Sequence, residues 1–401
     1  MPSEVASGEA EVATPDPTPP EAAPPESPSD VGTPPRPPPD SGPPEAGNSC
    51  DGLFPGEPGE PRSFQSPLYP PEYSCRPGTS DGWGILALPV RKDFQPHTTD
   101  VFLMSPTGAR QGTFRGVRMA SFGQPEGFLG VELHGGGGQT GVVAYDASGQ
   151  LIHRPYTWMG TALTVVAPTG GMVFFSEFTG QLTAYDSRAA ERWSRTLPAI
   201  SGGVVALGVD LQRNLLLLYD GASSFGEGTV AGLWVDSSGQ VGTPFLALTG
   251  LSNPRRLAFT FSPQVGSGLF LQVKDSTTPG KPAQWARAFP SMALASEPAP
   301  EWLSKHPDTS LQVVRGGRAY ARLPFRGQAS PDCSQSIEVL TPSGTSCGST
   351  RFALGDSACT TGAITVGYDG TVVQQWPQQL EHCNDAGSCS CTWRWWPGLL
   401  K

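Results

Sequence analysis

Residues 161–198 read TALTVVAPTGGMVFFSEFTGQLTAYDSRAAERWSRTLP, and this stretch decides the fold. It divides into four short runs, LTVVAP, GMVFFSEF, GQLTAYDS and ERWSRTLP, each with apolar residues that can alternate across a sheet. Turns rich in Gly, Thr, Asp and Ser separate the runs, and no long stretch shows the 3.6-residue period of a helix. The stretch therefore predicts four consecutive strands joined as hairpins.

The same plan recurs along the chain. Residues 203–248 contain GVVALGVD, NLLLLYDG, VAGLWVDS and VGTPFLAL, and a looser copy runs from 256 to about 294. Intervals of 41, 40, 50 and 39 residues separate five turn positions that we treat as equivalent: Ser105, Asp146, Asp186, Asp236 and Asp275. Such a period is the length of one four-stranded propeller blade. The sequence thus predicts an all-β fold, a β-propeller of six or seven four-stranded blades.

Related turns support this interpretation. They are MSPTG at 104–108, YDASG at 145–149, VDSSG at 235–239, TPSG at 341–344 and YDG at 368–370. Asp, Ser or Pro opens each turn, and Gly supplies the positive φ that closes a hairpin of three to five residues. Two stacked β-sandwiches would also have short strands, but the repeat of roughly 40 residues favours a propeller.

One segment carries a family resemblance. GQLTAYDSRAAERWSRTLP, residues 180–198, resembles the quinoprotein-type (PQQ-like) repeat, in which a glycine, an apolar strand ending in Asp and a Trp on the next strand recur. The match covers this blade well and others in part. The resemblance implies that Trp and Gly dock neighbouring blades, and hence structural roles for the repeat positions Asp146, Gly180, Asp186, Trp193, Asp236, Asp369 and Trp376.

The N-terminal segment differs from the rest of the chain. Its first 48 residues hold fifteen prolines, no aromatic residue, and nine acids against one base. Such a segment cannot bury enough apolar surface to fold, so residues 1–49 are predicted to be a disordered tail or linker. Residues 50–401 are predicted to form a single propeller domain with disulfide-rich termini.

The eight cysteines lie only where the chain enters and leaves this domain: Cys50, Cys75, Cys333, Cys347, Cys359, Cys383, Cys389 and Cys391. An even number in this placement predicts disulfides that staple the chain ends, with the last blade built from strands of both ends. Local spacing suggests the pairs Cys50–Cys75 and Cys333–Cys347. A zinc site at His382, Cys383, Cys389 and Cys391 is the alternative if the thiols are reduced.

Disulfides predict an oxidising, extracytoplasmic location, the periplasm or the cell surface. Residues 1–12 contain neither a basic region nor an apolar run of signal-peptide length, so we expect the export signal, or a lipid anchor, upstream of this sequence. No apolar run approaches the 18 residues of a membrane span, and 215–219 is typical of the longest. The closing CTWRWWPGLL segment is predicted to be the last strand, with Trp393 and Trp395 on one face and Trp396 on the other.

Charge and motifs restrict the possible functions. The tail carries −8 of the net charge of −10, which leaves the folded part near −2 with five lysines, so a nucleic-acid partner is not expected. GTSCG at 344–348 fits G-x-S-x-G but lacks the strand-to-helix turn that a nucleophile needs. We therefore predict no catalytic residues, cofactor or metal.

The leading hypothesis is an exported, non-enzymatic propeller that binds or scaffolds a protein or glycan partner. The alternative is a propeller enzyme with a site in the central channel, either a quinoprotein-like oxidoreductase or an enzyme acting on polysaccharides. Two facing carboxylates at the channel mouth would favour hydrolysis. An aromatic or polar rim would favour binding.

Overall fold

The computed structural model describes residues 49–400 apart from short segments, and residues 1–48 of the predicted tail lie outside the described residues. The omitted segments are 54, 81–84, 93–98, 116, 125–126, 135–138, 147–149, 154–156, 160–161, 178, 198–199, 201–202, 252, 276–281, 291–296, 315, 325–333, 354–363 and 377–382. Among the described residues, no helix has the length and apolar character needed to cross a membrane.

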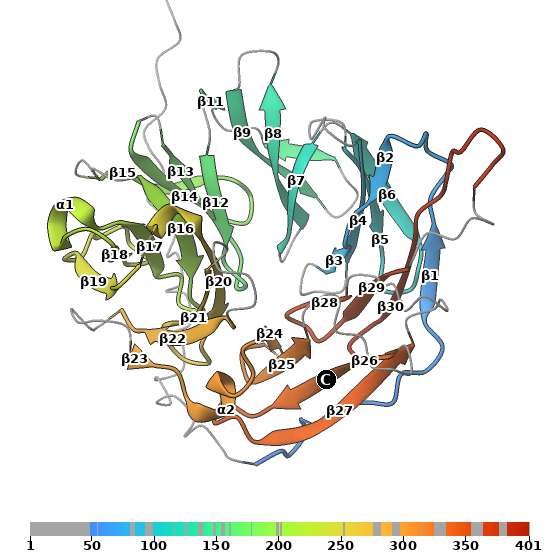
Figure 1. The fold of residues 1–401 in the computed structure, drawn as a ribbon. Helices are drawn as coiled ribbons and strands as arrows, with labels where there is room; N and C mark the ends of the chain where they lie inside the picture. Colours follow the sequence, from blue (N-terminus) through green and yellow to red (C-terminus); the bar gives the residue numbers. More distant parts are fainter. Residues whose placement is uncertain are drawn as a thin grey trace, which may run out of the picture. The chain divides into compact units, whose positions relative to one another are not determined.

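The described strands form seven antiparallel sheets arranged around a central axis, so the predicted propeller is confirmed and has seven blades (Figure 1). The three units predicted between residues 161 and 294 are blades 3, 4 and 5. Blade 3 contains β12 (Ala162–Val166), β13 (Met172–Ser176), β14 (Gln181–Tyr185) and β15 (Glu191–Thr196). Blade 4 contains β16 (Val204–Val209), β17 (Leu215–Asp220), β18 (Val230–Val235) and β19 (Phe245–Leu248). Blade 5 contains β20 (Leu257–Pro263), β21 (Leu269–Asp275), β22 (Gln284–Ala288) and β23 (Glu297–Pro298).

The other four blades precede and follow these units. Blade 1 contains β2 (Tyr73–Cys75), β3 (Thr79–Ser80), β4 (Leu86–Lys92), β5 (Thr99–Met104) and β6 (Arg110–Arg115). Blade 2 contains β7 (Val117–Gln124), β8 (Gly127–His134), β9 (Gln139–Asp146), β10 (Leu151–His153) and β11 (Thr157–Met159). Blade 6 contains β24 (Thr309–Val314), β25 (Ala319–Pro324), β26 (Ser334–Leu340) and β27 (Ser346–Ala353). Blade 7 contains β28 (Ile364–Val366), β29 (Val372–Trp376), β30 (Thr392–Trp396) and β1 (Arg62–Gln65). Single helical turns occur at α1 (Ala222–Phe225), η2 (Pro254–Arg256) and α2 (Glu301–Ser304).

The core lies between the blades. Seven apolar clusters of described residues each join two neighbouring blades. Strand β13 shows how: Val173 and Phe175 pack in the cluster shared with blade 4, whereas Met172 and Phe174 pack in the cluster shared with blade 2. Both faces of a middle strand are thus buried, which is why MVFFS reads as a nearly continuous apolar run.

The innermost strand of each blade lines the centre, and in blade 1 this strand is β3. Strand β12 contacts β16, β16 contacts β20, β20 contacts β24, and β28 contacts β3. One polar link joins two of these inner strands, since the backbone N–H of Val366 donates to Oε1 of Gln312 at 3.0 Å. The inner strands therefore form the wall of a central channel.

The ring closes in blade 7, as predicted. Strand β1 comes from the N-terminal side of the chain and pairs with β30 along its whole length, from Arg62 to Gln65. Trp393 and Trp395 are buried against blade 1, while Trp396 packs in the cluster shared with blade 6. The alternation predicted for the terminal strand is thus confirmed.

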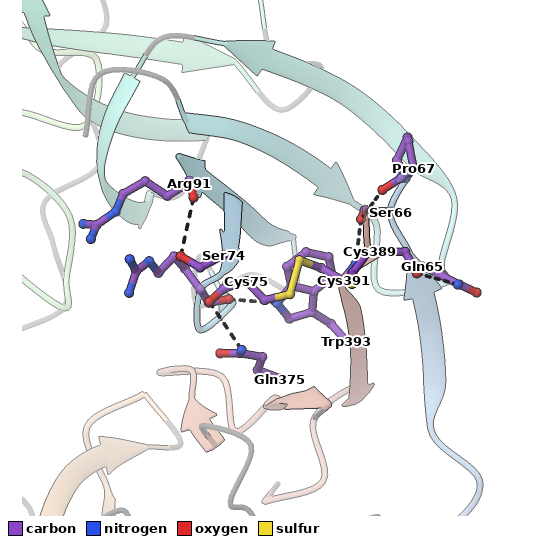
Figure 2. Close-up of a disulfide and its surroundings, with 12 residues drawn as sticks. Gln65, Ser66, Pro67, Ser74, Cys75, Arg91, Gln375, Cys389, Cys391 and Trp393 are labelled. Carbon is purple, nitrogen blue, oxygen red and sulfur yellow. Dashed lines mark hydrogen bonds between the residues drawn. A yellow bond between two sulfur atoms is a disulfide. The ribbon is translucent and has the colours of Figure 1, made fainter. Parts of the chain in front are cut away.

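Two disulfides fix this closure, but with partners other than those predicted. Cys75 is bonded to Cys391 beside β30 (Figure 2), and Cys50 is bonded to Cys347 on β27. The pairs Cys50–Cys75 and Cys333–Cys347 are therefore wrong. The reason is that β1 pairs with β30 and so carries the N-terminal segment across to the last blades, where the C-terminal cysteines lie.

A third disulfide joins Cys383 to Cys389. Since Cys391 is also oxidised, three of the four ligands suggested for zinc are engaged as disulfides, and His382 lies outside the described residues. The described part of the chain holds no group of His, Cys, Asp and Glu suited to a metal ion. The other two cysteines, outside the described residues, are Cys333 and Cys359.

The predicted turn chemistry is present at the third hairpin of several blades. One carboxylate oxygen of Asp186 accepts hydrogen bonds from the backbone N–H groups two and four residues further along, at 2.8 and 2.9 Å. Asp236 accepts the same pair, and Asp146 accepts the second of them. These three residues lie between the third and fourth strands of blades 2, 3 and 4.

One of the five aligned positions lies elsewhere. Asp275 ends β21, the second strand of blade 5, so the equivalence assumed for it is wrong. Asp369, singled out through the resemblance, lies between the first two strands of blade 7, with Trp376 on the second. Asp210, in the first hairpin of blade 4, accepts the same two backbone hydrogen bonds as Asp186, so the turn chemistry does not distinguish one hairpin from another.

Trp193 docks against the next blade. Its ring lies on Gly239 of blade 4, where a Cβ would approach Cδ2 of the indole to 2.8 Å, and Gly239 has a φ of +87°. Gly180 forms the turn between β13 and β14 at a φ of +64°, with open space where a Cβ would stand. The glycine that receives the indole therefore belongs to the neighbouring blade's turn.

The same contact recurs at two other interfaces. The ring of Trp395 in blade 7 lies over Gly108 of blade 1, and the ring of Trp302 lies on Gly344 of blade 6. Each glycine closes one of the turns singled out in the sequence, MSPTG and TPSG. These turn glycines thus combine a positive φ with space for an indole.

Candidate functional site

A cavity of about 460 Å³ lies at the centre of the ring, where the innermost strands of five blades meet. Its wall is built from Thr79 and Ser80 (β3), residues 164–168 (β12 and its turn), Phe261 and Pro263 (β20), residues 311–313 (β24) and residues 365–368 (β28 and its turn). Most of these side chains are apolar. The cavity is therefore of ligand size and largely apolar in character.

Some polar groups of this wall already have partners. The hydroxyl of Thr365 donates to the backbone oxygen of Gly78 at 2.6 Å. The hydroxyl of Ser80 donates to the carboxylate of Asp369 at 3.3 Å, and that carboxylate also accepts from the N–H and hydroxyl of Thr371. These bonds hold the wall together, and none of its described lining residues is an Asp, Glu, Lys, Arg or His.

Three other neutral groups have no hydrogen-bond partner among the described residues: the hydroxyl of Thr164, Nε2 of Gln312 and the hydroxyl of Tyr368. Burial raises the pKa of Tyr368, so its hydroxyl is a protonated donor at neutral pH. An apolar cavity with a few unpaired polar groups is the usual character of a ligand site.

A second pocket, of about 370 Å³, lies on blade 6. We call it the blade-6 pocket; its lining residues are His306, Thr309, Arg322, Pro324, Ser336, Glu338, Ser346, Gly348 and Ser349. Further along the same faces of β25 and β26, Tyr320 and Leu340 pack against blade 5. The pocket is thus the polar continuation of the interface between blades 5 and 6.

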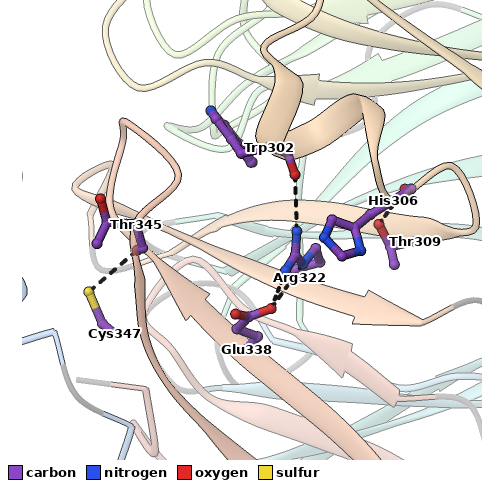
Figure 3. A network of polar contacts seen from close by, with 7 residues as sticks. All are labelled: Trp302, His306, Thr309, Arg322, Glu338, Thr345 and Cys347. Atoms are coloured by element: carbon purple, nitrogen blue, oxygen red, sulfur yellow. Dashed lines mark hydrogen bonds and ion pairs between the residues drawn. The ribbon is translucent and has the colours of Figure 1, made fainter.

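An ion pair forms the base of this pocket (Figure 3). Arg322 on β25 and Glu338 on β26 are cross-strand partners, and both Nε and Nη2 of Arg322 donate to Oε2 of Glu338, the former at 3.0 Å. Nη1 of Arg322 donates to the backbone oxygen of Trp302 at 3.2 Å. The arginine is 12% exposed and the glutamate 27%, so both side chains are partly shielded and held in one geometry.

His306 forms another wall of the pocket, next to Arg322 (Figure 3). Its backbone oxygen accepts from Nε1 of Trp285 at 3.3 Å and from the hydroxyl of Thr309 at 2.9 Å. Partial desolvation of the exposed His306 lowers its pKa, and the positive charge of Arg322 lowers it further against the opposing effect of Glu338. The imidazole is therefore neutral at pH 7.

Neither site was among the residues singled out in the sequence. The cysteines and repeat residues described above lie in disulfides, hairpin turns and blade interfaces. Ser346, from the GTSCG motif, does line the blade-6 pocket, but it begins strand β27, so a strand follows it where a nucleophile elbow requires a helix. Arg322 and Glu338 gave no local signal, because only strand register brings them together.

Comparisons with known proteins add little beyond the fold. No protein-family model matches the chain, and no curated protein matches it. Similar solved structures include the propeller domain of the Trilobed protease from Pyrococcus furiosus, at 8% identity and a TM-score of 0.47, with 76% of this chain and 91% of that chain covered. A streptogramin B lyase has 10% identity and a TM-score of 0.41, with 82% and 97% covered.

A prolyl endopeptidase structure has 12% identity and a TM-score of 0.48. The match covers 80% of this chain but 46% of that one. These likenesses are too distant to support an argument about activity, and the fold assignment rests on the strand order of the chain itself.

Proposed function

We propose that this protein is an exported, non-enzymatic binding propeller whose central cavity receives an uncharged, mainly apolar group of a protein partner. The observation that carries the proposal is the composition of the cavity wall. Its apolar side chains suit an apolar group, and the unpaired groups of Thr164, Gln312 and Tyr368 suit one or two hydrogen bonds from a peptide backbone or a neutral side chain.

The size of the cavity supports the same conclusion. Its volume of about 460 Å³ lies in the range of about 300–1,000 Å³ that is usual for ligand pockets. A pocket of this size accommodates a few side chains at the tip of a loop. The wall comes from five blades of a ring in which apolar clusters join each pair of neighbouring blades, so it needs little rearrangement to receive a partner.

The disulfides support the proposed location. Three disulfides among the described cysteines indicate an oxidising environment. We propose the periplasm or the cell surface, where such bonds persist and where the acidic, proline-rich tail would act as a tether. The alternative remains a propeller enzyme, either quinoprotein-like or acting on polysaccharides. For such an enzyme, Tyr368 is the one titratable side chain in the described part of the cavity lining.

The test is selection of a phage-displayed library of random dodecapeptides on the immobilised protein. A Thr164→Trp variant fills the cavity, and Thr243→Trp on the exposed surface is the matched control. We expect selected peptides to be rich in apolar, uncharged residues and to lose at least tenfold in affinity with Thr164→Trp but not with Thr243→Trp.

Two results would overturn the proposal. One is a selection that yields no binding peptide, and the other is a set of peptides that bind both variants equally. A glycan array probed in parallel distinguishes the partner class. If a neutral glycan binds the protein and the Thr164→Trp variant no longer binds it, the ligand of the central cavity is a glycan and not a protein.

A further inference from the structure

We propose that the blade-6 pocket binds a neutral saccharide unit. This site is separate from the central cavity and does not depend on the function proposed there. The pocket presents hydrogen-bonding groups from four neighbouring segments of blade 6, and their charges cancel. A neutral polyhydroxylated ligand is the chemical class that such a surface recognises.

The charges of the pocket compensate one another. The positive guanidinium of Arg322 and the negative carboxylate of Glu338 are joined by two hydrogen bonds, and His306 adds no charge at neutral pH. A phosphate or a carboxylate would meet Glu338 at the base of the pocket, and an ammonium group would meet Arg322. An uncharged ligand is repelled by neither Glu338 nor Arg322.

The free hydrogen-bonding groups form a polar row across the outer strands. Arg322, Glu338 and Ser349 are successive cross-strand partners on β25, β26 and β27, so their side chains share one face. Arg322 donates three hydrogen bonds to described residues, two to Oε2 of Glu338 and one to the backbone oxygen of Trp302. This leaves Oε1 of Glu338 with no partner among the described residues, so it is an acceptor that faces the pocket.

Three hydroxyl groups line the same pocket as this acceptor. Ser336 lies two residues before Glu338 on the same face of β26, and Ser346 and Ser349 come from β27. None of the three hydroxyls has a partner in the described part of the chain. A carboxylate oxygen can accept from the O–H groups of a sugar, while serine hydroxyls donate to or accept from the neighbouring sugar oxygens.

Geometry favours a sugar over water alone. The pocket has a volume of about 370 Å³, within the usual range for ligand pockets of about 300–1,000 Å³. The backbone oxygen of Trp302 holds the Arg322 side chain, and the strand register holds Arg322 opposite Glu338. The acceptor is therefore already oriented before a ligand arrives. The exposed His306 ring offers a flat side against which the C–H face of a pyranose can rest.

The experiment is a glycan array that contains neutral oligosaccharides together with sialylated, sulfated and amino-sugar members, probed with the full chain. Neutral hits are then titrated by calorimetry against three variants. Glu338→Gln removes the charged acceptor, and Ser349→Leu obstructs the pocket beside Glu338 while keeping both charges of the ion pair. Glu301→Gln, an exposed acid on α2, is the matched control for the first.

We expect neutral glycans to bind and their affinity to fall at least tenfold with Glu338→Gln, since a hydrogen bond to a charged group is lost. Ser349→Leu should weaken binding by a similar factor, and Glu301→Gln should leave it unchanged. Circular dichroism establishes that each variant is folded, and Ser349→Leu keeps the test valid if Glu338→Gln is not folded.

Preference for charged glycans, absence of any neutral hit, or binding insensitive to Ser349→Leu would overturn the proposal. If Thr164→Trp abolishes glycan binding and the blade-6 variants do not, the glycan binds in the central cavity and the proposal is wrong.

Discussion

The indole nitrogen of Trp193 donates a hydrogen bond to the backbone oxygen of Ser237, at 3.1 Å, across the boundary between blades 3 and 4. The ring of the same residue covers Gly239, two positions further along the turn. A single side chain thus anchors itself on the neighbouring blade by both a polar and an apolar contact. The equivalent contact of Trp395 with blade 1 also pairs ring packing on Gly108 with a hydrogen bond, to the backbone oxygen of Pro106 at 3.3 Å.

Substitution of Gly239 by alanine should be markedly destabilising. The new Cβ would collide with the Trp193 ring, and an L residue at a φ of +87° is itself strained. We expect a loss of about 1–2 kcal/mol from the backbone and about 1–3 kcal/mol more from the collision. Gly180→Ala is the control, because it has a positive φ but open space, and urea denaturation measures both. Equal losses for the two variants would contradict the docking role.

Asp210 should be among the most costly carboxylates to remove. It is fully buried and accepts four hydrogen bonds, from the backbone of Gln212, Asn214 and Gly268 and from the side chain of Asn214. The bond from Gly268 reaches it from blade 5. Because Asp210→Ala leaves these donors unpaired inside the protein, we expect a loss of about 3–5 kcal/mol in the free energy of unfolding. Asp236→Ala, in an exposed turn, should lose much less, and similar losses would show that burial is not the cause.

The disulfides should contribute unequally. Cys75 and Cys391 are 316 residues apart, whereas Cys383 and Cys389 are 6 residues apart. Cross-linking distant residues restricts the unfolded chain more, so replacing the Cys75–Cys391 pair by alanines should cost about 2–5 kcal/mol and replacing the Cys383–Cys389 pair should cost less. Thermal unfolding monitored by calorimetry gives the comparison, and a reversed order would contradict the entropic explanation.

His306 should titrate below the usual histidine pKa of about 6.5. Arg322→Gln should raise this pKa because a nearby positive charge is removed, and Glu338→Gln should lower it further because an attracting negative charge is removed. The unfolded state takes up the proton first as the pH falls, so this histidine makes the fold less stable as the pH drops from about 6.5 towards the folded-state pKa. NMR titration of the imidazole Cε1–H measures the shifts, and Lys305→Gln, a weaker influence, is the control.

Much of the fold was accessible from the sequence because it depends on local patterns. The blades with the clearest runs, 3 and 4, match the predicted strands closely, since MVFFS and LLLLYD are buried on both faces. The closing strand was also predictable, because alternation at Trp393, Trp395 and Trp396 depends only on the period of two. The misplacement of Asp275 has a physical reason, because aspartate turns do not mark one particular hairpin: Asp186 and Asp210 accept the same two backbone hydrogen bonds in different hairpins.

The candidate sites were not accessible in this way. The central cavity is formed by residues from five blades, from Thr79 to Tyr368, and no local pattern marks them. Arg322 and Glu338 stand on adjacent strands whose register sets their distance. The disulfide partners of Cys50 and Cys75 likewise depend on β1 crossing to the last blade, a long-range feature that spacing alone does not encode.

The position of β1 also determines when the ring can close during folding. Among the described strands β1 pairs with β30 alone, and Cys75 pairs with Cys391. In a chain synthesised and translocated from its N-terminus, residues 62–75 emerge long before their partners, so the ring stays open until the final strand arrives. An oxidant that acts early will find Cys75 without its native partner, and thiol–disulfide exchange must then correct the pairing. The export that we propose should therefore require a disulfide isomerase more strongly than the three disulfides of the described residues suggest.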